Sequence, residues 1–474
     1  MAGAGGVIFF CESCRERSIA AIARRKITRH FPFGILLVAC RVICAYKITD
    51  GFFHGESCVM LRRTRWVRVA CVAVLVMLGT SFPAAAESAA EDSQDALTVR
   101  GFGTLGLARS SSDQAEFVRD LSQPSGASTR WTGKLDSVLG LQLNARATER
   151  LEGVVQVVSR YRYDGNFRPE LTWAFARFDA NAYLSLRAGR LGTEFYMLAD
   201  SRLVGYSYLT VRPPSDYFGA LPFTYVDGAD ATETIPLGSG LLRGKLFSGV
   251  TREKLPLADR VWDIGGSRMT GVHLDYQIGA WSARLGYSTI RFNHDLPVGD
   301  LVDALSASGV PMAQDAARQL SVAGKRSHFY SLGIVYDKGA FQSQLMLSRT
   351  RQESRIFENS RAGYLLAGYR VQQVTPFLGY SWVNSTPRQL TTGLPNVPPL
   401  NQLNAALAAT LADSHSRQST IFVGARWDVQ RNIALKAQLD VVRGTPASIF
   451  PVRWEKPGWN GRTNVLSLTM DVVF

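Results

Sequence analysis

A two-residue alternation of apolar and polar side chains recurs along the chain and restricts its fold more than any other feature. In one such stretch Leu141 and Leu143 alternate with Gln142 and Asn144. Successive side chains of a strand point to opposite faces of a sheet, so each alternating segment has one apolar and one polar face. A soluble β-sandwich turns the polar face outward, and a membrane barrel turns the apolar face outward. The connections between strands must distinguish the two.

The connections alternate strictly between long and short. Short turns on one side, long loops on the other and an even number of strands are typical of bacterial outer-membrane barrels. The sequence therefore predicts an all-β fold, a transmembrane antiparallel up-and-down β-barrel of sixteen strands with long extracellular loops and short periplasmic turns. The predicted strands are 97–107, 131–148, 151–163, 168–178, 182–190, 223–235, 239–251, 266–278, 281–292, 327–337, 340–351, 360–371, 374–385, 416–428, 431–443 and 463–474.

Composition and charge exclude several other classes of protein. Apolar residues make up 46% of the chain and charged residues 19%, which excludes a disordered chain. No stretch beyond residue 100 approaches the ~18 apolar residues of a membrane helix. The net charge is +14, and residues 1–86 hold 12 basic and 4 acidic residues, or +8, which leaves +6 for 87–474. Most of the basicity thus lies in the N-terminal portion, and a nucleic-acid partner is not expected.

That N-terminal portion contains a predicted signal peptide at 60–86. A basic region, an apolar stretch at 69–79 and three alanines at 84–86 follow one another as in a cleaved secretory leader. We expect 1–59 to be an upstream extension from a mis-assigned start, 87–96 a short periplasmic segment and 97–474 the barrel in the outer membrane. A genuine long leader, or a short buried helix at 60–86, is the alternative. All six cysteines precede residue 72.

Specific segments carry a resemblance to a known family. These are LTVRGFG at 97–103, RAGR at 187–190 followed by ADSRLVGY at 199–206, and the terminal Phe474. With the sixteen-strand layout, 97–474 resembles the outer-membrane porins of Gram-negative bacteria. The resemblance implies a water-filled channel for small hydrophilic solutes or ions, narrowed by an in-folded loop at 191–222. It also implies outer-membrane lipid, lipopolysaccharide and the barrel-assembly machinery as partners, a homo-trimer, and Phe474 as the assembly signal.

Candidate site residues follow from this loop and from the alternation of the strands. Arginine and lysine rings favour anions, and the polar faces carry more of them than of carboxylates, so a mild anion preference is predicted. The alternative is that each arginine pairs with an acid and holds the wall or the loop in place. The expected constriction residues are Arg187, Arg190, Asp200, Arg202, Arg212, Asp216 and Tyr217. The expected lumen-lining residues are Arg100, Arg146, Arg160, Arg284, Arg370, Arg426 and Lys436.

Other functions are weaker on the sequence. The glycines at 101–106 match a dinucleotide fingerprint without the helix that it needs. No histidine after residue 86 has metal-ligand spacing, so neither a metal nor a cofactor is expected. A barrel enzyme acting on lipid remains an alternative, with His328 beside Ser327 or Ser331 as its candidate, and a structural or adhesive barrel is another. Segments 300–320 and 400–412 show helical spacing of Leu and Ala and are predicted as helices in loops.

Overall fold

The computed structural model describes residues 96–474 except 258–259, 446–447 and 449–451. The predictions for 1–59, 60–86 and 87–95 lie outside the described residues. Contacts divide the chain into two units, Met1–Asp92 and Ser93–Phe474, and the second is described below. Within the described part of the chain, no helix is both long enough and apolar enough to span a membrane.

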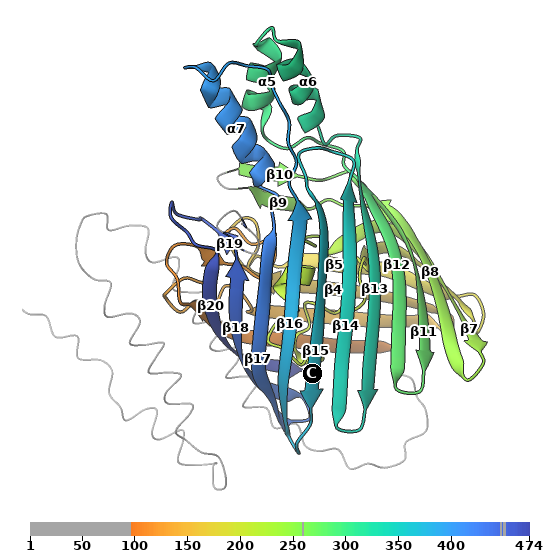
Figure 1. The fold of residues 1–474 in the computed structure, drawn as a ribbon. Coiled ribbons are helices and arrows are strands. Elements are labelled where there is room, and N and C mark those ends of the chain that lie inside the picture. The colour runs from red at the N-terminus through yellow and green to blue at the C-terminus, as the bar shows by residue number, and fades with distance from the viewer. Residues whose placement is uncertain (1–95, 258–259, 446–447, 449–451) are drawn as a thin grey trace, which may run out of the picture. The chain divides into compact units, whose positions relative to one another are not determined.

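Sixteen antiparallel strands close into one barrel, which confirms the predicted fold class (Figure 1). Each strand pairs with the next long strand along the chain, the up-and-down arrangement. The first and last strands pair from Phe102–Val473 to Ser110–Val465 and close the ring. The strands are β1 (Leu97–Ser110), β3 (Val138–Thr148), β4 (Leu151–Arg160), β5 (Glu170–Asp179), β6 (Leu184–Gly192), β7 (Tyr225–Leu237), β8 (Gly240–Val250), β11 (Arg268–Ile278), β12 (Trp281–Arg291), β13 (Arg326–Lys338), β14 (Phe341–Gln352), β15 (Asn359–Tyr369), β16 (Val374–Thr386), β17 (Arg417–Gln430), β18 (Ile433–Gly444) and β20 (Arg462–Val473).

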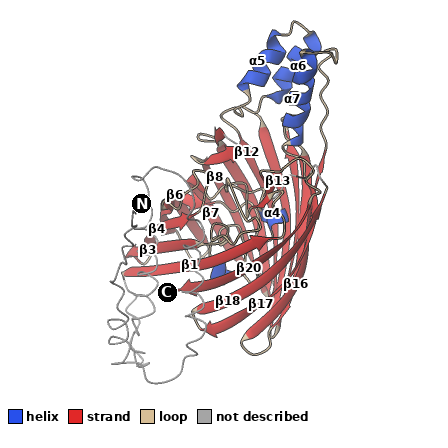
Figure 2. Ribbon diagram, turned by 90° about the vertical axis from the view of Figure 1, so that its left-hand side faces the viewer, coloured by secondary structure: helices blue, strands red, loops and turns tan. Residues whose placement is uncertain are grey.

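The long connections carry the remaining elements at one end of the barrel or inside it. The helices predicted in two loops are confirmed, and α5 packs against both α6 and α7 beyond the strand ends (Figure 2). The short helix α4 lies within the barrel in the same view. These elements are β2 (Glu116–Phe117), β9 (Lys254–Leu257), β10 (Arg260–Asp263), β19 (Val452–Arg453), η1 (Gly205–Ser207), α4 (Ser215–Phe218), α5 (Gly299–Ala307), α6 (Pro311–Leu320) and α7 (Leu400–Ala412).

One predicted strand begins too early. The sequence predicts a strand from residue 131, but β3 begins at Val138. In 131–137, Thr132 forms an isolated bridge with Ala108, and the Gln123 side-chain amide donates to the carbonyls of Lys134 and Leu135 at 3.2 and 3.0 Å. A side chain therefore satisfies these carbonyls, which lie outside the ladder.

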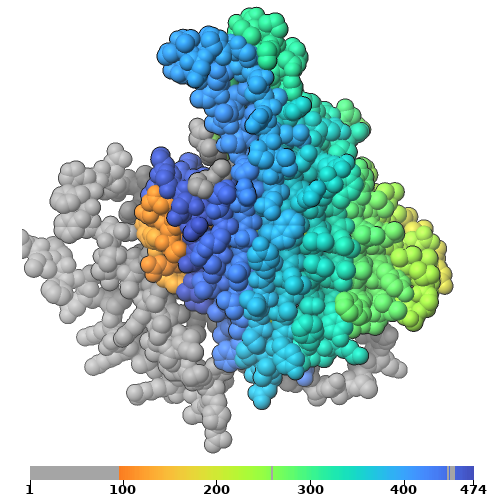
Figure 3. Space-filling view, viewed as in Figure 1, coloured from red at the N-terminus to blue at the C-terminus, as the bar shows by residue number. Residues whose placement is uncertain are grey.

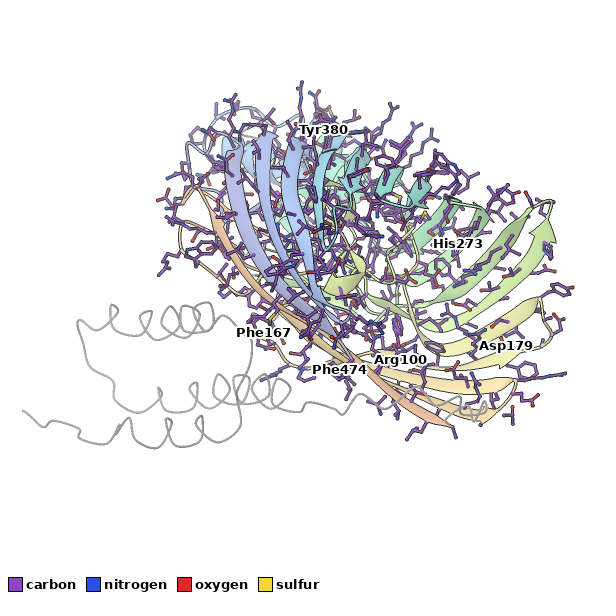
Figure 4. The ribbon with its side chains drawn as sticks, turned by 90° about the horizontal axis from the view of Figure 1, so that it is seen from below. Arg100, Phe167, Asp179, His273, Tyr380 and Phe474 are labelled. Atoms are coloured by element: carbon purple, nitrogen blue, oxygen red, sulfur yellow. The ribbon has the colours of Figure 1, made fainter. Side chains whose placement is uncertain are left out.

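The outer face of the barrel is apolar, as a transmembrane barrel requires. On β16 the side chains of Leu378 and Tyr380 are 58% and 47% exposed, and those of the alternate residues Phe377 and Ser381 are buried. Figure 4 shows Tyr380 outside the ring of strands and His273 inside it. In lipid, every backbone polar group must be paired within the protein, and a closed sheet meets this requirement because it has no free edge.

A glycine near the start of β1 is needed where the barrel closes. The Gly101 N–H donates to the Phe474 carbonyl at 2.7 Å, and the Phe474 N–H donates to the Gly101 carbonyl at 3.0 Å. A Cβ at Gly101 would lie 2.2 Å from the Phe474 ring, so only glycine fits under it. Because β1 continues as a strand to Ser110, the glycines at 101–106 do not form a nucleotide-binding turn.

Candidate pore constriction

The long loop between β6 and β7, residues 193–224 and hereafter the inner loop, folds into the barrel. Most of its side chains are buried, and it contacts strands far away in the sequence. Its helix α4 packs against β15, β16 and β17, and η1 packs against β1 and β20. The loop that was expected to narrow the lumen therefore crosses it.

Arg212 fixes the middle of the inner loop to the wall. Its guanidinium donates to Asp136 at 2.6 and 2.9 Å and to Asp440 at 2.7 Å, and it also bonds the Ser467 hydroxyl at 2.5 Å. The side chain is 2% exposed. Removing one partner of a buried ion pair leaves an uncompensated buried charge and strongly destabilises the protein. Arg212 thus anchors the loop and does not face the passage.

Asp216 and Tyr217 on α4 are also anchors. The Asp216 carboxylate accepts hydrogen bonds from Ser381 on β16 at 2.7 Å and from Gln418 on β17 at 2.5 Å. The Tyr217 ring lies 4.8 Å from Tyr196 and 5.3 Å from Tyr364, centroid to centroid, and is 2% exposed. Such tilted and edge-on aromatic contacts add to simple burial. Both residues therefore pack against the wall and do not line the constriction as the sequence predicted.

Two cations, Lys436 on β18 and Arg426 on β17, hold residues 205–210 of the inner loop in place. They donate hydrogen bonds to its backbone carbonyls. Lys436 Nζ donates to the carbonyl oxygens of Gly205 at 2.7 Å and Thr210 at 3.0 Å, and it lies 3.0 Å from Asp471. Arg426 donates to the carbonyls of Tyr206 and Tyr208 at 2.6 and 3.0 Å. Both residues face inward as expected, but they contact the inner loop and not open solvent.

Arg202 lies at the base of the inner loop. Its guanidinium donates to the carbonyl of Phe223, and its own carbonyl accepts from Arg119. The first bond joins two parts of the inner loop, and the second ties the loop to the Arg119 side chain of the connection between β1 and β3. Arg202 is 5% exposed. It is therefore a further anchor.

A charge cluster on β6, β7, β8, β11 and β12 faces the first turn of the inner loop. Arg187 lies 2.5 Å from Asp230, and Arg284 lies 2.5 Å from Asp275. Glu194 of the inner loop receives Lys245 at 2.5 Å. Further contacts are Arg187 to Glu194 at 3.1 Å, His273 Nε2 to Glu194 at 3.3 Å and His273 Nδ1 to Asp275 at 3.2 Å. Two longer ion pairs join Lys245 to Asp230 at 3.9 Å and Arg284 to Glu194 at 3.8 Å.

The cluster is electrically balanced. Three permanent cations, those of Arg187, Lys245 and Arg284, stand against three carboxylates, those of Glu194, Asp230 and Asp275. Alternating signs in a narrow space stabilise each charge. Asp200 of the inner loop interacts electrostatically with Glu194, Lys245 and Arg284, so the cluster offers no excess of positive charge. Asp200, another expected constriction residue, is exposed to the lumen and accepts from the Ser201 N–H at 2.9 Å.

Arg190 is a correction. In β6 it lies three residues beyond the inward-facing Arg187, so alternation places it on the outer face. There it bonds Asp227 of β7 at 2.6 and 2.9 Å and covers the Tyr225 ring at 3.9 Å. Arg190 therefore stabilises the outside of the wall and does not line the constriction. Because side chains alternate along a strand, the sequence alone could have placed Arg190 on the outer face.

The remaining lumen residues divide between paired and exposed positions. Arg160 is buried and donates to Ser122 at 2.8 Å. Arg370 follows β15 and is exposed. Arg100 and Arg146 are exposed on the inward face near the short turns, where Arg177 and Arg243 join them. We call these four residues the lower vestibule: Arg100, Arg146, Arg177 and Arg243.

The lower vestibule has an excess of positive charge. Along β1–β8 near the short turns, the inward carboxylates are Glu152, bonded by Asn144 at 2.9 Å, and Asp179, 3.0 Å from Arg177. Four arginines less two carboxylates leave +2 along these strands. Sequence analysis missed Arg177 and Arg243, although the alternation of their predicted strands places both inward. It also missed Glu194, because loop residues follow no such rule.

The predicted enzyme candidate does not assemble. His328 faces outward, with Nδ1 2.9 Å from the Tyr287 hydroxyl and Nε2 3.2 Å from Glu353, while Ser327 and Ser331 lie on the opposite face. A different group forms at the loop ends, where His415 Nδ1 lies 2.9 Å from Glu358 and 3.4 Å from Ser385. Serine and carboxylate share one ring nitrogen there, whereas a nucleophilic serine needs the other nitrogen.

Comparison with known proteins adds likenesses at the level of the fold. No family model matches the sequence, and no curated protein matches it. Among solved structures, the chain is similar to an anion-selective porin from Comamonas acidovorans, with 14% identity and a TM-score of 0.49 over 80% of this chain and 99% of the other. It is also similar to Salmonella typhi OmpF in complex with daunomycin, with 12% identity and a TM-score of 0.49 over 80% and 97%.

A third likeness is to the outer membrane channel DcaP of Acinetobacter baumannii, with 13% identity and a TM-score of 0.44 over 81% of this chain and 99% of that chain. The class of this protein rests on its own strand pairing and on the inner loop. A closed ring of sixteen antiparallel strands with an apolar outside and a loop crossing its lumen is a porin-like outer-membrane barrel.

Proposed function

We propose that the protein is a porin, a water-filled channel in the outer membrane for passive diffusion of small hydrophilic solutes and ions. The observation that carries the proposal is the inner loop, which is anchored on the wall formed by β15–β20 and β1 and leaves exposed polar side chains on β3–β8. Barrels of sixteen strands are wide enough for an aqueous channel.

The proposed channel has a mild preference for anions, set at the lower vestibule and not at the charge cluster. The cluster is balanced, whereas the vestibule has an excess of +2 along β1–β8, where Arg177 is 46% exposed on its side chain. Rings of arginine attract anions into a pore, and a low-dielectric wall focuses the field of such charges.

Location and assembly follow from the same proposal. The outer face would contact outer-membrane lipid, including lipopolysaccharide. Phe474, which closes the ring with Gly101, would act as the recognition signal for the barrel-assembly machinery. A homo-trimer is proposed as the working form.

Planar-bilayer recording tests the channel. We expect stepwise conductance from the wild-type protein and a reversal potential in a salt gradient that indicates anion preference. The variant Arg177→Gln with Arg243→Gln lowers the anion-to-cation permeability ratio by about twofold, because it removes charge from a partly screened wall. The matched control, Arg130→Gln with Arg168→Gln, alters two exposed loop arginines and leaves the ratio unchanged.

Two results would contradict the proposal. Purified, folded protein that never conducts would exclude a porin. A permeability ratio that stays the same in the vestibule variant would show that these arginines do not set the selectivity.

A further inference from the structure

A cavity lies among the loops at the end of the barrel from which α5, α6 and α7 project (Figure 3). Its volume is about 740 Å³, which is within the range of small-molecule sites in proteins. One wall is α7, and another is the segment 387–394 between β16 and α7, hereafter the strap. Met312 of α6, Glu358 and His415 complete the lining. None of these residues belongs to the inner loop, so the cavity is not part of the proposed constriction.

The strap is fixed to the neighbouring helices, so the cavity is built into the fold. The Asn404 side-chain amide donates to the Leu394 carbonyl at 3.2 Å, and the Thr392 hydroxyl donates to Asn404 Oδ1. The same hydroxyl oxygen accepts from the Leu394 N–H at 3.1 Å. Gly393 has a φ of 67°, a conformation that favours glycine, and a Cβ there would lie 3.1 Å from the Met312 sulfur. The strap therefore runs close to both α6 and α7.

The interior of the cavity is lined largely by leucine. Leu394 of the strap and Leu407 and Leu411 of α7 are buried, and Leu390 of the strap packs against the same hydrophobic core. Ala408 of α7 also lines the cavity, and it is exposed. Removal of apolar surface from water drives binding, so this lining favours a ligand with a hydrocarbon body.

Two charged side chains line the cavity, and they differ in their partners. Glu358 is buried, and its Oε2 accepts from the Ser385 hydroxyl and lies 2.9 Å from His415 Nδ1. The buried Nε of Arg388, on the strap, has no hydrogen-bond partner among the described residues, and no salt bridge joins Arg388 to Glu358 or to another described carboxylate. A buried donor without an acceptor costs free energy. This side of the cavity therefore lacks an acceptor that a ligand can supply.

We propose that the cavity binds a small apolar carboxylate, a hydrocarbon body that carries one carboxylate group. The carboxylate accepts paired, charge-assisted hydrogen bonds from the Arg388 guanidinium. The hydrocarbon body lies against the leucines of the strap and of α7. A single arginine in the same cavity as the buried acid Glu358 suits one negative charge and not the two of a phosphate. The volume suits a molecule of drug size and not the surface of a second protein.

Isothermal titration calorimetry of the folded protein in lipid nanodiscs tests the site, with empty nanodiscs as the blank. The probe is the naphthaleneacetate anion, and naphthaleneethanol is its uncharged counterpart. We expect Arg388→Gln to bind the anion about tenfold more weakly than the wild type, as for the loss of hydrogen bonds between charged groups, and to bind the alcohol equally. The control Arg355→Gln removes the same charge from an exposed arginine that does not line the cavity, and it binds the anion as the wild type does.

The apolar part of the cavity has its own pair of variants on α7. Ala408→Trp fills the cavity and is expected to abolish binding of both compounds. Ala409→Trp places the same side chain at the next exposed position, which does not line the cavity, and leaves binding unchanged. Equal strand content by circular dichroism shows that each variant is folded.

Four results would overturn the proposal. These are no binding of naphthaleneacetate by the wild type, binding of the alcohol as tight as that of the anion, undiminished binding of the anion by Arg388→Gln, and equal loss in the two tryptophan variants. The calorimetry requires no conductance, so the site can fail while the proposed channel stands, and the channel can fail while the site stands.

Discussion

Arg212 shows what one side chain contributes to the constriction. It is the counter-charge of two buried carboxylates, Asp136 and Asp440, from opposite ends of the barrel sequence. We expect Arg212→Ala to release the inner loop and to destabilise the protein by about 3–5 kcal/mol, because two buried charges lose their partner. Thermal unfolding measures the stability, and larger, noisier conductance reports the released loop. The exposed Arg168→Ala serves as the control, and stability equal to the wild type in Arg212→Ala would contradict the anchor role.

Glu253, in the loop after β8, makes the end of the inner loop sensitive to pH. Burial raises its pKa from the ordinary value of 4.5 to about 7, although its hydrogen bonds from Thr224 act against the shift. Between these two values the folded protein binds more protons than the unfolded chain, so stability falls as pH rises through this window. We expect unfolding at about pH 8 to be easier than at about pH 5, by on the order of 2 kcal/mol from this group.

The variant Glu253→Gln tests this dependence. It keeps an acceptor for the Thr224 N–H but cannot ionise, so the difference between the two pH values shrinks. An undiminished difference, measured by circular dichroism during heating, would show that other groups cause it.

At the scale of elements, the strands were predictable and the packing of the inner loop was not. Alternation is local, so all sixteen strands of the barrel could be identified, and parity within a strand also decides which residues face inward. Arg190 was misplaced only because that parity was not applied to it. Arg212 contacts Asp440, which lies 228 residues away in the sequence, and Lys436 contacts Gly205, which lies 231 residues away. No local pattern encodes such pairings, so expected pore residues became anchors.

The short helix η1 gives a prediction for one element. A Cβ at Gly205 would lie 2.2 Å from Asp471 and 2.3 Å from Thr104, so a larger side chain must push η1 away from β1 and β20. We expect Gly205→Val to change conductance while leaving the strand content, measured by circular dichroism, intact. Gly299→Val at the start of α5, where nothing lies within 4 Å of the added atom, is the control. The same conductance in both variants would mean that η1 does not border the passage.

For the whole molecule, the alternating connections predict which side of the membrane each faces. The loop that carries α5 and α6 should be extracellular, and the turn after β13 should be periplasmic. A cysteine at Gln319 is expected to react with a membrane-impermeant thiol reagent on intact cells, whereas one at Lys338 is not. Gln319 lies in α6 and is half-buried, and Lys338 ends β13 and is exposed. Equal labelling would contradict the topology.

The pairing of Gly101 with Phe474 also has a consequence in time. Nine register pairs join β1 to β20, and beside them the Phe474 side chain covers Gly101, which has no Cβ to clash with it. Until these pairs form, β1 and β20 both present unpaired N–H and C=O groups, and such strand edges readily pair with other chains. During folding, this seam is therefore the part of the wall where a wrong strand could add.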